Sequence, residues 1–155
     1  MITNKLFILD LLDAIYKLGR YKTMITSNGK SIVVVDDERD IVNQIKRSLE
    51  AMDGLKVYTF IDPFAALEHF NSACKDPHIV ISDIRMPGMN GYEFVKQVKK
   101  INPQVKIVLM SSFEIDDNNL LDILPNVKID TFLQKPFSLD TLTNIVAIPS
   151  TAEHV

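Results

Sequence analysis

Short runs of β-branched and aliphatic residues alternate with helix-like stretches along most of this chain. Five runs are strand candidates: 31–35, 55–60, 79–83, 105–110 and 131–134. Between them, apolar residues recur at the three- and four-residue spacing of amphipathic helices. Parallel strands need crossover connections, and helices normally supply them. The alternation therefore predicts one α/β domain, with a doubly wound, five-stranded parallel sheet and helices on both faces.

The length of the chain fits one such domain and short flanking segments. Of its 155 residues, 46% are hydrophobic, which is enough to build a core. We place the domain at 30–148, between an N-terminal helical extension and linker (1–29) and a C-terminal tail (149–155). Residues 6–18 have amphipathic spacing, and this helix either covers apolar surface of its own chain or binds a partner or second copy. Because MIT recurs at Met24, translation starting there is a further hypothesis.

Composition excludes several classes of function. The formal net charge is -3, so no overall basic field attracts nucleic acid, and we expect no direct nucleic-acid binding. Cys74 is the only cysteine, which rules out an internal disulfide and suits a reducing compartment. No apolar run reaches the roughly 18 residues of a membrane helix. We therefore expect a cytoplasmic protein without a membrane segment.

Polar residues stand at the carboxyl ends of four of the predicted strands: Asp36 and Asp37, then Asp83, Ser111 and Lys135. These ends meet at one crevice of an open α/β sheet. Three crowded carboxylates repel one another, and a hard cation such as Mg²⁺ relieves that repulsion. A lysine ammonium is suited to a phosphoryl oxygen, and a hydroxyl can donate to another. Together these groups indicate phosphoryl transfer to a carboxylate.

Four segments carry a resemblance to a known family. They are VVVDD at 33–37, ISDIRMPGMNG at 81–91, IVLMSS at 107–112 and FLQKPF at 132–137. In this order and spacing they resemble the CheY-like receiver domain of two-component response regulators. The resemblance covers 30–148 and implies a flavodoxin-like strand order, 2-1-3-4-5.

The resemblance also implies roles for the polar residues. Asp83 would be the phosphoacceptor and a metal ligand. Asp37 would bind Mg²⁺ directly and Asp36 mainly through water, while the backbone carbonyl of Arg85 completes the protein's share of the ligands. Lys135 would pair with the phosphoryl group.

The family's switching device maps onto the last two strands. Ser111 would be the hydroxyl that moves towards the phosphoryl group, and Phe132 its aromatic partner. The Lys135–Pro136 bond would be cis. The readout surface would comprise the helix expected at 117–124, the last strand and the final helix.

We therefore expect a stand-alone response-regulator receiver. A sensor histidine kinase or phosphotransfer protein would phosphorylate it, and it would signal to a downstream protein. Such a chain catalyses only its own phosphorylation and dephosphorylation, and is not an enzyme for an outside substrate. A homodimer remains an open alternative.

Two other functions are considered. A Mg²⁺-dependent phosphohydrolase with an aspartate nucleophile would need a second carboxylate two residues after Asp83, where this chain has Arg85. A receiver-like binding module would never take phosphate. A separate hypothesis concerns Phe113, which together with Arg85 would shield an acyl phosphate from water and slow its hydrolysis.

Overall fold

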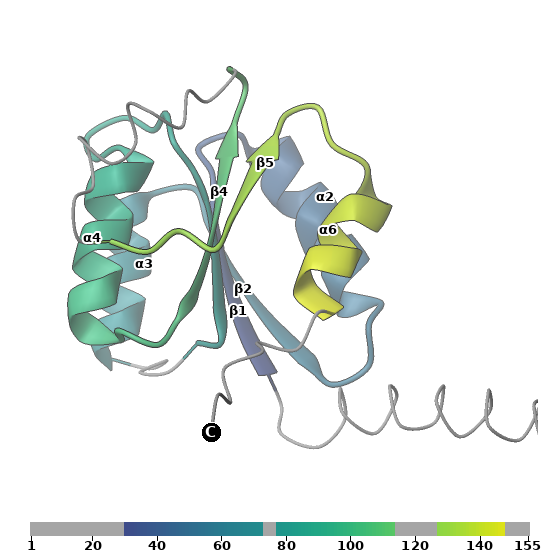
Figure 1. Ribbon diagram of the computed structural model, residues 1–155, viewed down its shortest axis with the longest axis horizontal. Helices are drawn as coiled ribbons and strands as arrows, with labels where there is room; N and C mark the ends of the chain where they lie inside the picture. The colour runs from purple at the N-terminus through teal and green to yellow at the C-terminus, as the bar shows by residue number, and fades with distance from the viewer. Residues whose placement is uncertain (1–29, 73–76, 114–126, 148–155) are drawn as a thin grey trace, which may run out of the picture.

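The structure is a computed structural model, and it describes residues 30–72, 77–113 and 127–147. Its elements in chain order are β1 (Lys30–Val35), α2 (Arg39–Glu50), β2 (Leu55–Phe60), α3 (Pro63–Ser72), β3 (Ile79–Asp83), α4 (Gly91–Ile101), β4 (Lys106–Ser111), β5 (Thr131–Gln134) and α6 (Leu139–Ala147). All neighbouring strands are parallel and lie in the order β2-β1-β3-β4-β5, which confirms the predicted fold (Figure 1).

Several predictions fall outside the described residues. These are the N-terminal helix at 6–18, Cys74, the helix at 117–124 and the C-terminal tail. The proposed limits of the domain, 30 and 148, stay predictions. In the part of the chain that is described, no helix is both long and apolar enough to cross a lipid bilayer.

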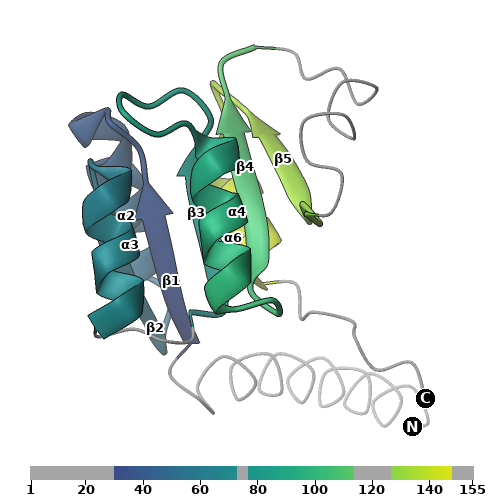
Figure 2. The same cartoon turned by 90° about the vertical axis from the view of Figure 1, so that its left-hand side faces the viewer.

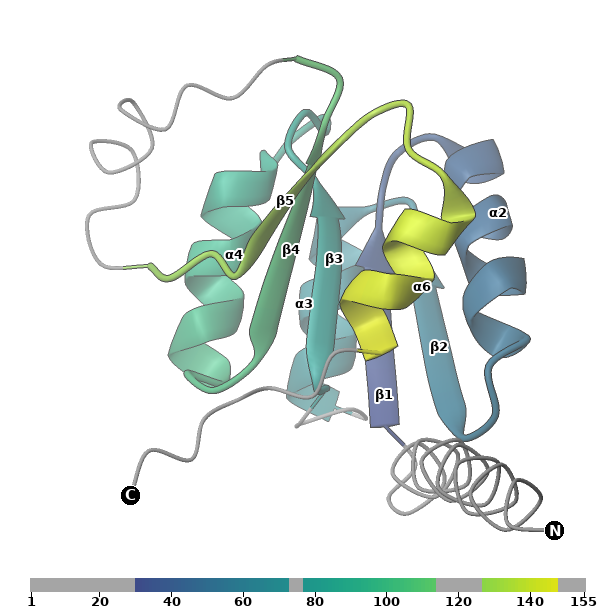
Figure 3. The same cartoon turned by 45° about the vertical axis from the view of Figure 1, so that its right-hand side comes forward.

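The helices cover both faces of the sheet. Helices α3 and α4 lie on one face (Figure 2), and α2 and α6 lie on the other (Figure 3). Successive strand residues point to opposite faces, so a strand buried on both sides must be apolar throughout. In β1, Val33 and Val35 pack towards α3 and α4, whereas Ile32 and Val34 pack towards α2 and α6. The continuous apolar runs in the sequence therefore reflect a sheet covered on both sides.

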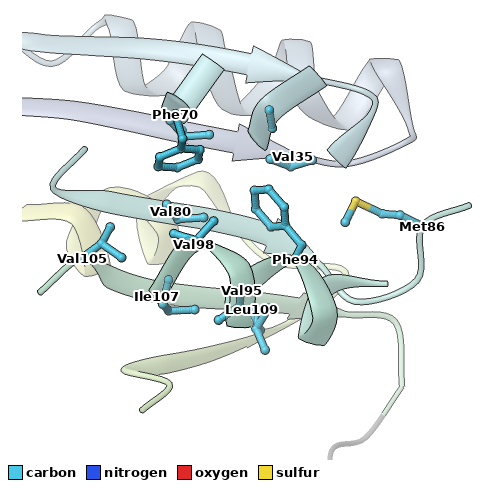
Figure 4. Close-up of a cluster of buried hydrophobic side chains, with 12 residues drawn as sticks. Val35, Phe70, Val80, Met86, Phe94, Val95, Val98, Val105, Ile107 and Leu109 are labelled. Atoms are coloured by element: carbon cyan, nitrogen blue, oxygen red, sulfur yellow. The ribbon is translucent and has the colours of Figure 1, made fainter. Parts of the chain in front are cut away.

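The core beneath α3 and α4 is built around two aromatic rings. Phe70 of α3 and Phe94 of α4 are fully buried, with their ring centroids 6.3 Å apart in an edge-to-face arrangement (Figure 4). Such pairs add to the stabilisation that buried area alone provides. This contact fixes α3 and α4 to each other and to the central strands.

Local hydrogen bonds set where the helices begin. The Phe64 amide donates to Asp62 Oδ1 over 3.0 Å, and the Thr141 amide donates to Ser138 Oγ over 3.1 Å. Aspartate and serine are both residue types that commonly cap helices. The start of α4 has a full capping box, because the Glu93 amide donates to Asn90 Oδ1 and the Asn90 amide donates to Glu93 Oε2. These caps fix the helix starts at the edge of the sheet where the polar residues gather.

Gly91, the first residue of α4, lies against the end of β3. A Cβ atom at this position would come within 2.2 Å of the Asp83 carbonyl oxygen and 2.8 Å of the Ile84 Cα. The Gly91 amide donates to the Ile84 carbonyl over 2.8 Å. Only glycine allows this close approach of two backbone segments. It therefore helps to place the end of β3, and with it Asp83.

Candidate functional site

The register of the sheet brings the polar strand ends together. Val35 of β1 lies opposite Ser82 of β3, one residue before Asp83. Ser111, the last residue of β4, lies opposite Gln134 of β5, one residue before Lys135. The predicted residues Asp36, Asp83, Ser111 and Lys135 therefore stand along one edge of the sheet, as expected for an open α/β fold.

Three carboxylates form a cluster at this edge. Asp36, Asp37 and Asp83 each offer one oxygen, and these oxygens all lie within 4.8 Å of one another. Asp36 and Asp83 are buried, whereas Asp37 is exposed. Asp37 and Arg85 also line an open pocket beside the cluster. An all-oxygen ligand set with an open side fits Mg²⁺, which keeps several waters and phosphate oxygens among its ligands.

The Lys135 ammonium lies among three carboxylates. Its Nζ is 2.7 Å from Asp36 Oδ2, 2.8 Å from Asp83 Oδ1 and 3.3 Å from Glu38 Oε1. Burial by itself lowers the pKa of Lys135, but hydrogen bonds and charge interactions with Asp36 and Asp83 outweigh it and raise that pKa above its ordinary value. The side chain therefore stays an ammonium, a positive point charge directed at Asp83.

Asp36 is fully buried at 0% exposure. Burial raises the pKa of Asp36, and the nearby charge of Asp83 adds to this effect. The hydrogen bonds from Lys135 and from the Glu38 amide, 2.9 Å from Oδ1, oppose the rise without cancelling it. A buried carboxylate that is costly to ionise is relieved by positive charge, and so the cluster favours binding of a cation.

Both side-chain oxygens of Asp83 are held in place. Oδ1 forms the ion pair with Lys135, and Oδ2 accepts a hydrogen bond of 2.8 Å from the Arg85 amide. The Ile84 amide donates to the Met110 carbonyl, which ties the chain after β3 to β4. This carboxylate is thus oriented, ion-paired and adjacent to an open pocket, which are the conditions a nucleophile needs.

Ser111 and Phe132 lie where the sequence places them, on neighbouring strands. The Ser111 hydroxyl is bound to its own loop, because Oγ is 3.0 Å from both the carbonyl and the amide of Phe113. Phe132 is half-buried against the core beneath α3 and α4. Phe132 of β5 lies opposite Leu109 of β4, and Ser111 follows Leu109 by two residues. Ser111 and Phe132 are therefore diagonal neighbours on the same face of the sheet. The Lys135–Pro136 bond is cis.

Arg85 and Phe113 meet across the site. The Arg85 Cζ atom lies 3.8 Å from the centroid of the Phe113 ring, within the range of a cation–π interaction. The two residues follow β3 and β4 respectively, so the pair joins the loop after Asp83 to the loop after the neighbouring strand. The sequence singled out both residues, and their suggested shielding of Asp83 stays a prediction.

The sequence did not predict the contacts of two residues of the site, Glu38 and Gly91. Glu38 was not expected to contact Lys135, because no local pattern links residues that lie 97 positions apart. Gly91 appeared only as the last residue of the segment 81–91, without a role of its own. Its close approach to Asp83 and Ile84 depends on how β3 and α4 meet, which no local pattern specifies.

Comparisons with known proteins agree with this geometry. The family described as "Response regulator receiver domain" matches residues 32–147. The DNA-binding transcriptional regulator NtrC of Escherichia coli is 34% identical over 113 residues, which are 73% of this chain and 23% of NtrC. This chain therefore spans about a quarter of the length of that relative.

Solved structures of other proteins have the same fold. An uncharacterized protein from Neptuniibacter caesariensis is 33% identical to this chain, with a TM-score of 0.66, over 77% of this chain and 85% of that one. The BeF₃-activated receiver domain of DrrB, from Thermotoga maritima, is 26% identical with a TM-score of 0.64, over 76% and 93%. Receivers are regulatory modules that respond to phosphorylation. The presence of a receiver therefore implies a kinase that donates the phosphoryl group. By its sequence match and its fold, this chain belongs to the response-regulator receiver family of two-component systems.

Proposed function

We propose that Asp83 accepts a phosphoryl group from a histidine kinase or phosphotransfer protein in a Mg²⁺-dependent reaction. The observation that carries this proposal is the position of Asp83, held between the Lys135 ammonium and the Arg85 amide and beside two further carboxylates. The protein is a switch that catalyses only its own phosphorylation and dephosphorylation. It signals to a downstream protein rather than acting on an outside substrate.

The residues of the site divide the chemistry between them. A side-chain oxygen of Asp83 attacks phosphorus, forming a P–O bond while the bond from phosphorus to the donor breaks and its electron pair leaves with the donor. Lys135 stays protonated and neutralises charge on the transferred group. Asp36, Asp37, Asp83 and the Arg85 carbonyl would hold Mg²⁺, which supplies further neutralisation of phosphoryl charge when bound.

Phosphorylation then biases a packing equilibrium. Among the described residues, the Ser111 hydroxyl is hydrogen-bonded to neutral backbone groups of Phe113, and charged phosphoryl oxygens are stronger hydrogen-bond acceptors. A shift of Ser111 towards the phosphoryl group opens space that Phe132, its diagonal neighbour, fills. The phosphoryl charge thus shifts the equilibrium between two side-chain packings of similar energy. The shift changes the surface over β5 and α6, which a partner protein then recognises.

Incubation with acetyl phosphate and Mg²⁺ tests the proposal. We expect wild type to gain the mass of one phosphoryl group, Asp83→Ala to gain none, and omission of Mg²⁺ to prevent the gain. Turnover of a phosphate ester by wild type would instead favour the phosphohydrolase. If neither acyl phosphate nor turnover appears, the constitutive binding module is the better description.

Mg²⁺ should stabilise the protein through the carboxylate cluster. At a concentration about ten times the dissociation constant, binding to the folded state alone raises the free energy of unfolding by about 1.4 kcal/mol. Asp37→Asn removes one predicted ligand and one repelling charge, so this variant should be more stable than wild type without Mg²⁺ and should lose the Mg²⁺ effect. Thermal unfolding with and without Mg²⁺ measures both. Asp40→Asn, which changes an exposed carboxylate outside the cluster, should respond to Mg²⁺ like wild type.

The Arg85–Phe113 pair should lengthen the life of phospho-Asp83. Phe113→Ala removes a contact of the strength of an exposed cation–π pair, and it opens a path for water, so we expect hydrolysis about two- to fivefold faster. Arg85→Ala should act in the same direction. The decay of the phosphorylated mass after removal of acetyl phosphate measures the lifetime. Phe64→Ala is the matched control, because Phe64 and Phe113 are similarly exposed, at 53% and 52%. Lifetimes equal to wild type in both test variants would contradict the shielding role.

A further inference from the structure

We infer that Glu38 is an exchangeable partner of Lys135, which competes with the phosphoryl group for the lysine ammonium and slows phosphorylation of Asp83 by anionic donors. This inference rests on the proposed function. Glu38 is therefore a positioning residue that acts through Lys135 and does not itself bind the reacting atoms.

The first observation is that Glu38 stands at a helix start without capping it. It occupies the N-cap position of α2 with an extended backbone, yet its side chain accepts no capping hydrogen bond. The side chains that ordinarily cap a helix from this position are the shorter ones of Asp, Asn, Ser and Thr, which reach an amide of the first turn. Here the carboxylate is instead directed across the sheet edge to Lys135, a residue 97 positions further along the chain.

The second observation is that Lys135 already contacts as many carboxylates as its ammonium has N–H donors. An ammonium has three N–H donors, and the structure supplies three carboxylates. When a phosphoryl oxygen enters the site, one of these contacts must be given up or shared. The charge of Lys135 cannot reach its full effect on the phosphoryl group while all three remain.

The third observation ranks the contacts of Lys135. Those to Asp36 and Asp83 are short and buried, and Lys135 itself is only 9% exposed. The contact to Glu38 is the longest at 3.3 Å, and the Glu38 side chain is 61% exposed. An exposed carboxylate is readily hydrated when it leaves its partner, so Glu38 is the contact that is lost at least cost. Two buried carboxylates still hold Lys135 in place.

The direction of the effect follows from these contacts. Removing the charge of Glu38 weakens its hold on one donor of Lys135, because a neutral amide oxygen is a weaker acceptor than a carboxylate. It also removes a repulsion on an approaching anionic phosphate donor. At saturating Mg²⁺, we expect Glu38→Gln to be phosphorylated by acetyl phosphate about two- to fivefold faster than wild type, the range expected for loss of one exposed ion pair. High ionic strength should reduce this ratio towards one, because salt screens exposed charges.

Two variants make the test specific. Glu38→Asp keeps the negative charge and should stay closer to wild type than Glu38→Gln does. Asp40→Asn makes the same change in net charge in the first turn of α2, but Asp40 has no ion pair with Lys135, and its rate should match wild type. The affinity for BeF₃⁻ in the presence of Mg²⁺, measured by NMR titration, should rise by a similar factor in Glu38→Gln alone.

The possible results distinguish a failure of the role of Glu38 from a failure of the proposed function. A Glu38→Gln rate equal to that of Asp40→Asn, or below that of wild type, would overturn the role of Glu38 and leave phosphorylation of Asp83 intact. An increase that persists unchanged at high ionic strength would also count against it. If wild type itself takes no phosphoryl group, the proposed function fails first.

Discussion

Replacing Gly91 with alanine should destabilise the domain by about 3 kcal/mol, the upper end of the usual cost of forcing extra atoms into a packed site. The added Cβ would lie 2.2 Å from the Asp83 carbonyl oxygen and 2.8 Å from the Ile84 Cα. Both of these atoms are backbone, so no side-chain rotation relieves the clash. Either α4 or the end of β3 must move, and Asp83 moves with it.

Whether Gly91→Ala stabilises or destabilises the protein distinguishes the steric clash from helix propensity. Within a helix, alanine is preferred over glycine by about 1 kcal/mol, so propensity alone predicts that Gly91→Ala is stabilising. Urea unfolding distinguishes the two expectations directly. Asn90→Ala serves as a control, since it removes only the cap of α4 and should cost about 1 kcal/mol. A Gly91→Ala variant as stable as wild type would mean that the close approach has no energetic consequence.

Replacing Lys135 with methionine should cost about 3 kcal/mol of folding stability at neutral pH without Mg²⁺, because it leaves buried carboxylates unpaired. The Asp36→Asn/Lys135→Met double variant should lose less than the sum of the two single changes, by about 1–2 kcal/mol, because the two side chains are in direct contact. Urea unfolding of the four proteins measures this coupling. Additive losses would show that Lys135 and Asp36 do not stabilise each other.

The cost of Lys135→Met should depend on pH in two directions. The raised pKa of Lys135 means that its contribution is complete below the unfolded value of about 10.4 and is lost as pH rises through the folded value. The raised pKa of Asp36 means that its buried carboxyl favours folding when protonated, and that this contribution is lost as pH rises through its folded value. The difference between wild type and Lys135→Met should therefore shrink both in acid and in strong alkali, with its maximum between.

The predictable part of the site consists of residues fixed by the backbone. Asp36, Asp83 and Lys135 could be found because each directly follows or ends a strand, and parallel strands of a doubly wound sheet end at the same edge. The apolar runs were long enough to locate the strands to within one residue. For β4, the run was expected at 105–110 and the strand is Lys106–Ser111.

The unpredicted part consists of side-chain choices between competing partners. Glu38 directly precedes α2 in the sequence, and only the packed structure shows that its side chain pairs with the distant Lys135. The Ser111 hydroxyl contacts its own loop, a local hydrogen bond that competes with contacts across the site. Switching by Ser111 and Phe132 depends on the energy difference between two side-chain packings. A sequence pattern does not determine that difference.

Chemical location of the acyl phosphate tests the central claim most directly. Borohydride reduces an acyl phosphate to an alcohol, which converts a phosphorylated aspartate to homoserine that peptide mass spectrometry can locate. After treatment with acetyl phosphate and Mg²⁺, we predict homoserine at position 83 and at no other aspartate, and none in Asp83→Ala or in wild type without Mg²⁺. Homoserine at Asp36 or Asp37, or its absence from position 83 in a protein that has gained a phosphoryl group, would contradict the account.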